Sequence, residues 1–174
     1  MWVFGYGSLI WSPGFPFAES QIARLDGWQR SFCMRSIHHR GTPEDMGLVL
    51  ALDQAQGATC DGVAFRVVPG SEADTLHYFR ERELISSAYK ETWLSVTLQA
   101  GQLAQALAYV VDRDQEQYCG GLALAEQARI IATAKGGRGT NRDYLFSTAQ
   151  HLAELGIADP DLDWLVTSVK QLDT

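Results

Sequence analysis

The sequence predicts an α+β fold: a small mixed, mainly antiparallel β-barrel or sheet, with one embedded helix and a helical C-terminal third. Strand-like segments fill the first two thirds of the chain, and one amphipathic segment interrupts them after Ser71. From Leu122 onwards only helical patterns occur. Because strict β-α-β alternation is absent, a doubly wound parallel sheet is disfavoured. The length of 174 residues fits one domain over residues 1–174.

The individual elements are predicted from apolar periodicity and turn residues. An apolar strand beginning at Trp2 runs into a glycine turn, and residues 11–16 form a loop. The further strands are Gly27–His38, Gly47–Leu52, Gly62–Val68, Trp93–Gln99 and Leu103–Val111, with a glycine-containing hairpin connection between the second and third of these. The helices are Glu72–Ile85 behind Ser71, with Asp74 completing a variant capping box, Leu122–Ala134, Asn141–Leu155 behind Thr140, and Pro160–Gln171 behind Asp159. Lys135–Asn141 is predicted to be a loop between helices.

Charge and cysteine content exclude several classes of function. The net charge is −7 and no run of Lys or Arg occurs, so nucleic acid and anionic membrane are disfavoured as partners. Cys33, Cys60 and Cys119 form no C-x-x-C pair, which argues against a zinc ribbon or a redox motif. With no signal peptide, this pattern favours a cytoplasmic protein. His38 and His39 are disfavoured as metal ligands, because neighbours on an extended segment point to opposite sides.

A glycine turn directly follows the first strand. Its residues, proposed to bind substrate, are Val3, Phe4, Gly5, Tyr6, Gly7, Ser8 and Leu9. Glycine permits backbone conformations closed to other residues, and successive amides in such a turn can converge on an anion such as a carboxylate. The alternative is a tight strand exit in which glycine relieves crowding. The turn matches neither G-x-G-x-x-G nor G-x-S-x-G, so neither a dinucleotide site nor a serine nucleophile is indicated.

The helix predicted after Ser71 carries a candidate catalytic acid, Glu83. At about 100° per residue, Glu83 shares a face with Leu76 and Phe79, whereas Glu81 points elsewhere. A carboxylate turned inwards loses hydration, which raises its pKa towards the range useful for acid/base catalysis. Alternatively, Glu83 is a last-turn residue that pairs with Arg80 or sits at the edge of the core. An acid there opposes the helix dipole, so its position calls for an explanation.

Several motifs occur in a consistent order from about residue 2 to about residue 165. They are Val3–Trp11, Gly27–Phe32, His39–Gly41, Gly47–Leu52, Arg82–Leu84, Tyr89, Thr92–Leu94 and Gly137–Leu145. Together they resemble the ChaC-like, glutathione-specific γ-glutamylcyclotransferases, within the wider γ-glutamylcyclotransferase fold. The chain departs from the family's pattern after the glutamate, where Ser86-Ser87-Ala88 stand in place of glycine. Because of that departure, Glu81 is kept as an alternative to Glu83 for the catalytic glutamate.

The resemblance implies a carbon–nitrogen lyase that converts glutathione to 5-oxoproline and Cys-Gly. It implies that the turn from Gly5 to Leu9 holds the substrate's α-carboxylate and that Glu83 moves the protons. Turn amides or a tyrosine such as Tyr118 are the candidates for stabilising the oxyanion. No metal or other cofactor is required, and the expected partner is a small-molecule γ-glutamyl compound. The alternatives are a cyclotransferase for other γ-glutamyl amines or amino acids, a hydrolase that releases glutamate, and a non-catalytic γ-glutamyl-binding protein.

Overall fold

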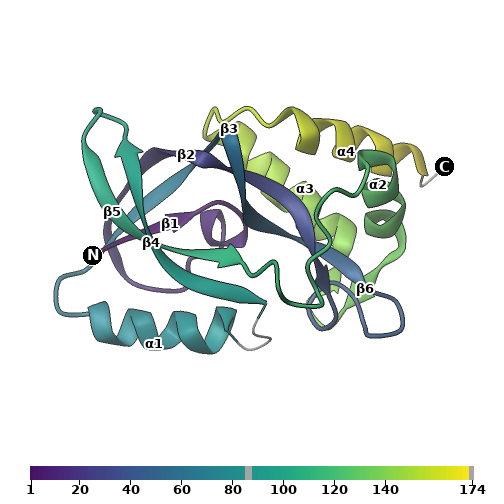
Figure 1. Cartoon of the computed structure of the whole chain (residues 1–174), viewed down its shortest axis with the longest axis horizontal. Coiled ribbons are helices and arrows are strands. Elements are labelled where there is room, and N and C mark those ends of the chain that lie inside the picture. The colour runs from purple at the N-terminus through teal and green to yellow at the C-terminus, as the bar shows by residue number, and fades with distance from the viewer. Residues whose placement is uncertain (85–87, 173–174) are drawn as a thin grey trace. The chain divides into compact units, whose positions relative to one another are not determined.

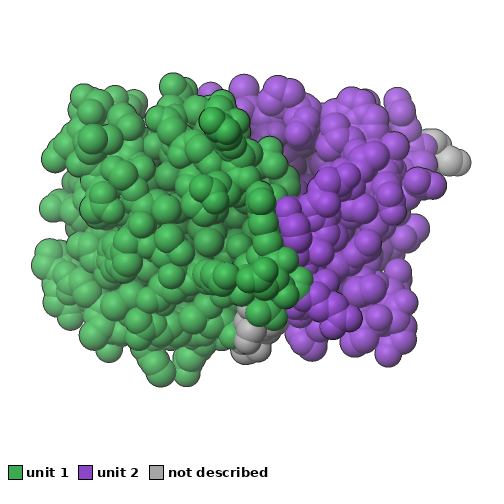
Figure 2. Space-filling view, in the orientation of Figure 1, with its two compact units in different colours: residues 1–31, 51–115 green, residues 32–50, 116–174 purple. Residues whose placement is uncertain are grey.

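The computed structural model of the chain describes residues 1–84 and 88–172 (Figure 1). The chain folds into two compact units (Figure 2). The first contains residues 1–31 and 51–115, and the second contains residues 32–50 and 116–174. The β-rich part and the embedded helix α1 belong mainly to the first unit, whereas the C-terminal helices belong to the second.

Five strands form a closed barrel, which confirms the predicted α+β class. They are β1 (Trp2–Gly5), β2 (Phe17–Ser36), β3 (Gly47–Val67), β4 (Tyr89–Leu98) and β5 (Leu103–Val111). The barrel order is β1-β3-β2-β4-β5, with an additional pairing of β3 with β5. The ladders of β1 with β3, β2 with β4 and β4 with β5 are antiparallel, whereas β5 pairs with β1 and β3 in parallel. The sheet is therefore mixed and mainly antiparallel, as predicted.

The prediction for the segment Gly47–Val68 was wrong in one respect. Two strands with a hairpin connection were expected, but β3 is one continuous strand of 21 residues. Gly57 lies within it at a φ of 78°, a conformation that glycine adopts easily and that often marks a bulge. The exposed polar residues around Gly57 look like a turn in sequence, but the neighbouring strand of the barrel keeps the backbone extended. For the same reason β2 begins at Phe17, ten residues before the predicted start, and continues past Gly27 at a φ of 81°.

Helix α1 (Glu72–Glu83) packs its apolar face into the core of the first unit. Phe79 is fully buried and its ring centroid lies 5.0 Å from that of Phe15 and 5.7 Å from that of Tyr109. Ser71 is the N-cap residue as predicted, but its side chain makes no capping hydrogen bond. Instead the Glu72 carboxylate accepts a hydrogen bond from the Gly70 amide at 2.7 Å. The helix was expected to reach Ile85, a residue that lies outside the described ranges.

The second unit contains the helices α2 (Leu124–Thr133), α3 (Asn141–Glu154) and α4 (Pro160–Leu172). The predicted N-caps of α3 and α4 are confirmed, since Thr140 accepts from the Asp143 amide at 3.2 Å and Asp159 accepts from the Leu162 amide at 3.1 Å. The segment between α2 and α3, predicted as a loop, contains a two-stranded ribbon of β6 (Lys135–Gly136) and β7 (Gly139–Thr140). No helix in the described ranges is long and apolar enough to span a membrane.

Replacing Asp159 with alanine is expected to lower the free energy of unfolding by about 1 kcal/mol, because the Leu162 amide loses its capping oxygen. Urea denaturation measures the loss. Asp161→Ala is the matched control, since it removes an acid from the same helix end without removing an N-cap hydrogen bond. Equal losses in the two variants would show that charge near the helix terminus, and not capping, stabilises α4.

Candidate active site

The glycine turn leaves β1 at Gly5 and enters a short 3₁₀ helix, η1 (Ser8–Ile10). A Cβ on Gly5 would lie 3.1 Å from the Leu9 Cβ and 3.1 Å from the Phe65 ring, so close packing favours glycine there. Neither Gly5 nor Gly7 adopts the positive φ that would require glycine for conformational reasons; Gly7 has a φ of −137°. Glycine at position 5 is therefore better explained by close packing than by its backbone conformation.

Three contacts fix the backbone of this turn to the barrel. A Cβ on Gly62 of β3 would overlap the Gly5 carbonyl oxygen, so the two backbones touch directly. The Arg30 Nη1 donates hydrogen bonds of 3.0 Å to the carbonyls of Tyr6 and Asp61. The Tyr6 hydroxyl donates to the Tyr109 carbonyl at 2.8 Å. The turn is thus held through its carbonyls and by the Tyr6 side chain.

The seven predicted binding residues divide into two groups. Val3, Phe4 and Leu9 are buried in the apolar core and position the turn through packing. Gly5, Tyr6 and Gly7 are buried within the turn itself, and Ser8 is half-buried. A ligand at this turn would meet backbone groups and Ser8, not the apolar side chains.

Glu83 is the last residue of α1, and its side chain is largely buried, as predicted for an acid on the inward face. Its side chain is 18% exposed, whereas that of Glu81 is 69% exposed and pairs with His77. The Glu83 Oε1 lies 3.0 Å from the Arg82 Nε. Arg80, the partner considered from the sequence, instead pairs with Glu91 at 2.9 Å. The helix therefore presents Glu83, and not Glu81, towards the interior of the first unit.

Arg82 connects Glu83 to the glycine turn. Its Nη2 donates to the Ser8 Oγ at 3.0 Å, while its Nε faces Glu83. Its Nη1 donates to the Ser12 carbonyl and the Tyr78 hydroxyl, both at 2.8 Å. The acid at the end of α1 and the serine of the turn thus share one guanidinium.

Tyr109 on β5 adds a second polar network beside this site. Its hydroxyl donates to the Glu91 Oε2 at 3.0 Å. Burial raises the pKa of Tyr109 far above its ordinary value, and the hydrogen bond to Glu91 and the charge of Glu83 act in the same direction. The hydrogen bond from Arg80 lowers the pKa of Glu91. Tyr109 is therefore a neutral hydrogen-bond donor and Glu91 an anion at neutral pH.

The family model for the ChaC-like protein matches residues 1–172. The chain belongs to the ChaC-like family. An Escherichia coli relative named glutathione-specific γ-glutamylcyclotransferase is 38% identical over 99% of this chain and 74% of its own length. An Arabidopsis thaliana relative named γ-glutamylcyclotransferase 2-3 is 35% identical over 99% of this chain and 89% of its own length.

Solved structures support the fold of this ChaC-like chain. A crystal structure of a yeast γ-glutamyl cyclotransferase specific to glutathione matches with a TM-score of 0.89 at 24% identity. The match covers 98% of this chain and 96% of the yeast chain.

Sequence reasoning missed two features of this ChaC-like chain. Arg82 was not singled out, because successive residues on a helix point about 100° apart and nothing in the pattern brings Arg82 to Ser8. Tyr109 and Glu91 were not paired either, since their contact depends on the register in which Glu91 faces Tyr109 across β4 and β5. Tyr118, a candidate oxyanion donor from the sequence, belongs to the second unit, whereas Glu83 belongs to the first.

Proposed function

We propose that this chain is a γ-glutamylcyclotransferase that cleaves glutathione to 5-oxoproline and Cys-Gly. One structural observation supports it most directly: a largely buried carboxylate, Glu83, and the glycine turn are bridged by Arg82. Membership of the ChaC-like family and the similarity to a glutathione-specific γ-glutamylcyclotransferase of Escherichia coli support the choice of reaction and of glutathione.

In the proposed reaction the α-amine of the γ-glutamyl group attacks its own γ-carbonyl carbon. A five-membered lactam closes, and the bond from the γ-carbon to the Cys-Gly nitrogen breaks. Because nucleophile and electrophile belong to one residue, the enzyme's main task is to hold the substrate in a folded, near-attack conformation.

Glu83 is proposed to accept the proton from the attacking amine and to return one to the departing nitrogen. This role requires an ionised carboxylate at the start of the reaction. The guanidinium of Arg82, 3.0 Å away, favours that ionised form and opposes the loss of hydration expected from burial. A positioned acid/base of this kind contributes about 10² to 10⁴ in rate.

The glycine turn is proposed to bind the substrate's α-carboxylate, which places the adjacent amine. The first amides of a helix have no partner within that helix, and η1 begins at Ser8 in this turn. The Ser8 Oγ accepts from Arg82, so its own hydrogen can be donated to a carboxylate. Ser8 would thus bind substrate on one side and Arg82 on the other.

Incubation of the purified chain with glutathione and, separately, with γ-glutamyl amines tests the proposal, with products identified by mass spectrometry. We expect 5-oxoproline and Cys-Gly from glutathione. Free glutamate would identify a hydrolase. Turnover of γ-glutamyl amines alone would place the chain with cyclotransferases for those compounds. No turnover of any γ-glutamyl compound, with binding retained, would identify a non-catalytic binding protein.

A further inference from the structure

We infer that Arg82 is a positioning residue that holds the Glu83 carboxylate and the Ser8 hydroxyl at a fixed spacing. This inference rests on the proposed function and deepens it, because it assigns the element that aligns the acid/base with the turn. Arg82 itself need not touch the substrate, since it acts through Glu83 and Ser8.

Each of the three guanidinium nitrogens of Arg82 contacts a different partner or pair of partners. The Nε faces the Glu83 Oε1, and the Nη2 donates to the Ser8 Oγ, each at 3.0 Å. The Nη1 is held by the Ser12 carbonyl and the Tyr78 hydroxyl. Because the guanidinium is planar and rigid, fixing Nη1 also fixes the directions of the other two nitrogens. The separation of Glu83 from Ser8 therefore follows from the shape of one side chain.

The surroundings of Arg82 differ from those of an ordinary surface arginine. Its side chain is only 12% exposed, whereas Arg80 on the same helix is 56% exposed. A Cβ on Gly14 would overlap the Tyr78 hydroxyl, so the group that holds Nη1 is itself tightly packed against the loop after η1. Polar contacts between largely buried groups are screened less than exposed ones, so the contacts of Arg82 are stronger than those of an exposed arginine.

Arg82 also stabilises an acidic residue at the last position of α1. The C-terminus of a helix carries partial negative charge and disfavours Glu83, but a cation in the last turn offsets this. Arg80 lies in the same last turn but bonds to Glu91 on β4, so it does not face the acid. A purely dipolar role would be satisfied by any cation at position 82, whereas the positioning role requires the planar fork of arginine.

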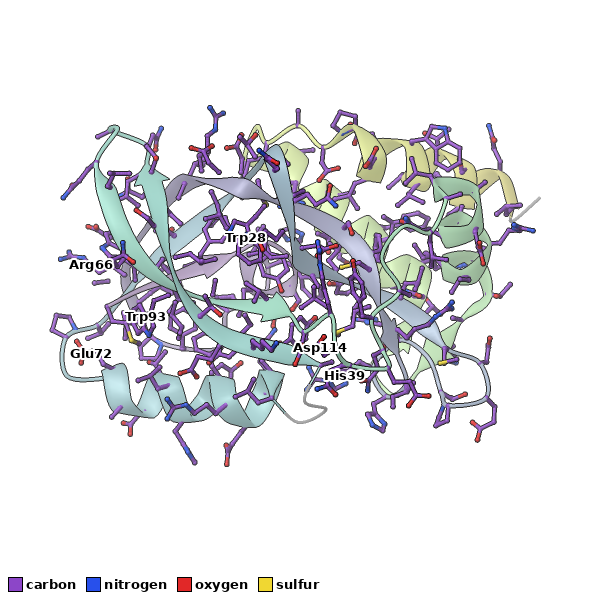
Figure 3. All side chains as sticks on the ribbon, viewed as in Figure 1. Trp28, His39, Arg66, Glu72, Trp93 and Asp114 are labelled. Atoms are coloured by element: carbon purple, nitrogen blue, oxygen red, sulfur yellow. The ribbon has the colours of Figure 1, made fainter. Side chains whose placement is uncertain are left out.

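The test compares Arg82→Lys and Arg82→Gln with the wild-type chain by steady-state kinetics on glutathione. We expect kcat to fall about 10²-fold in both variants, since misplacement of a reacting group by about 1 Å can cost that much, with a smaller change in KM. Arg66→Gln is the matched control, because Arg66 projects from the barrel into an exposed ion pair with Glu19 (Figure 3). It should retain wild-type kcat. Wild-type kcat in Arg82→Lys would overturn the inference.

Two further measurements separate positioning from folding. Guanidinium ion added to Arg82→Ala should restore part of the lost kcat, whereas it should not raise the kcat of Glu83→Gln.

In a double-mutant cycle, Ser8→Ala should lower kcat/KM several-fold less in the Arg82→Gln background than in the wild type, because Ser8 has already lost its partner. Full additivity in a folded double variant would contradict the inference. If the wild-type chain itself produced no 5-oxoproline, the proposed function would fail first, and the Arg82 role with it.

Discussion

Glu83→Gln is expected to lower kcat on glutathione by about 10² to 10⁴, with little change in KM. Glutamine preserves the volume and can still accept a hydrogen bond from Arg82, but it cannot accept the proton of the attacking amine. The Glu83 side chain is largely buried next to Arg82, whereas the neighbouring acid Glu81 is exposed and is not expected to replace it. The production of 5-oxoproline under saturating glutathione measures the effect.

Glu81→Gln is the control for this variant. It removes a carboxylate two residues away on the same helix, but that carboxylate is 69% exposed and pairs with His77. Activity should stay close to that of the wild type. If Glu81→Gln were the inactive variant and Glu83→Gln the active one, the proposed catalytic residue would be wrong. Isothermal titration of the inactive variant with glutathione shows whether substrate binding survives.

Phe79→Ala is expected to lower the free energy of unfolding by about 3 to 5 kcal/mol. Phe79 is fully buried and its ring contacts the rings of Phe15 and Tyr109, so its removal leaves a cavity between α1 and the barrel core. A loss of that size is a large part of the roughly 5 to 15 kcal/mol that stabilises a typical domain. Urea denaturation monitored by circular dichroism measures it.

His77→Ala on the same helix is the matched control. His77 is 75% exposed and its Nε2 lies 3.2 Å from the exposed Glu81 carboxylate, so its removal should change the free energy of unfolding by about 0.5 kcal/mol or less. Phe79→Leu should lower the free energy of unfolding by an amount between those of Phe79→Ala and His77→Ala, since leucine keeps most of the buried apolar volume. A loss below about 1 kcal/mol for Phe79→Ala would mean that α1 is not anchored by this ring, and that the position of Glu83 depends on other contacts.

Local sequence patterns predicted a structural feature correctly where the interaction that causes the feature is itself local. Thr140 and Asp159 cap their helices as predicted, because an N-cap bonds to an amide only two or three residues ahead. Glu83 could be chosen over Glu81 because helical geometry alone separates their directions. The prediction failed around Gly57, where the same polar residues suit either a turn or an exposed stretch of strand, and pairing with a distant strand decides between them.

By itself the sequence determined that a glycine turn follows the first strand and that the chain resembles the ChaC-like family, and helical geometry favoured Glu83 over Glu81 as the inward-facing acid. Only the tertiary structure decided that Arg82 joins Glu83 to the glycine turn, through contacts with Ser8 and Ser12 some 70 residues away along the chain. It also decided that Arg80 pairs with Glu91 and that crowding by Leu9 and Phe65 favours glycine at position 5. The physical reason is that helical periodicity sets the direction in which a side chain points, whereas closure of the barrel sets which residues it contacts.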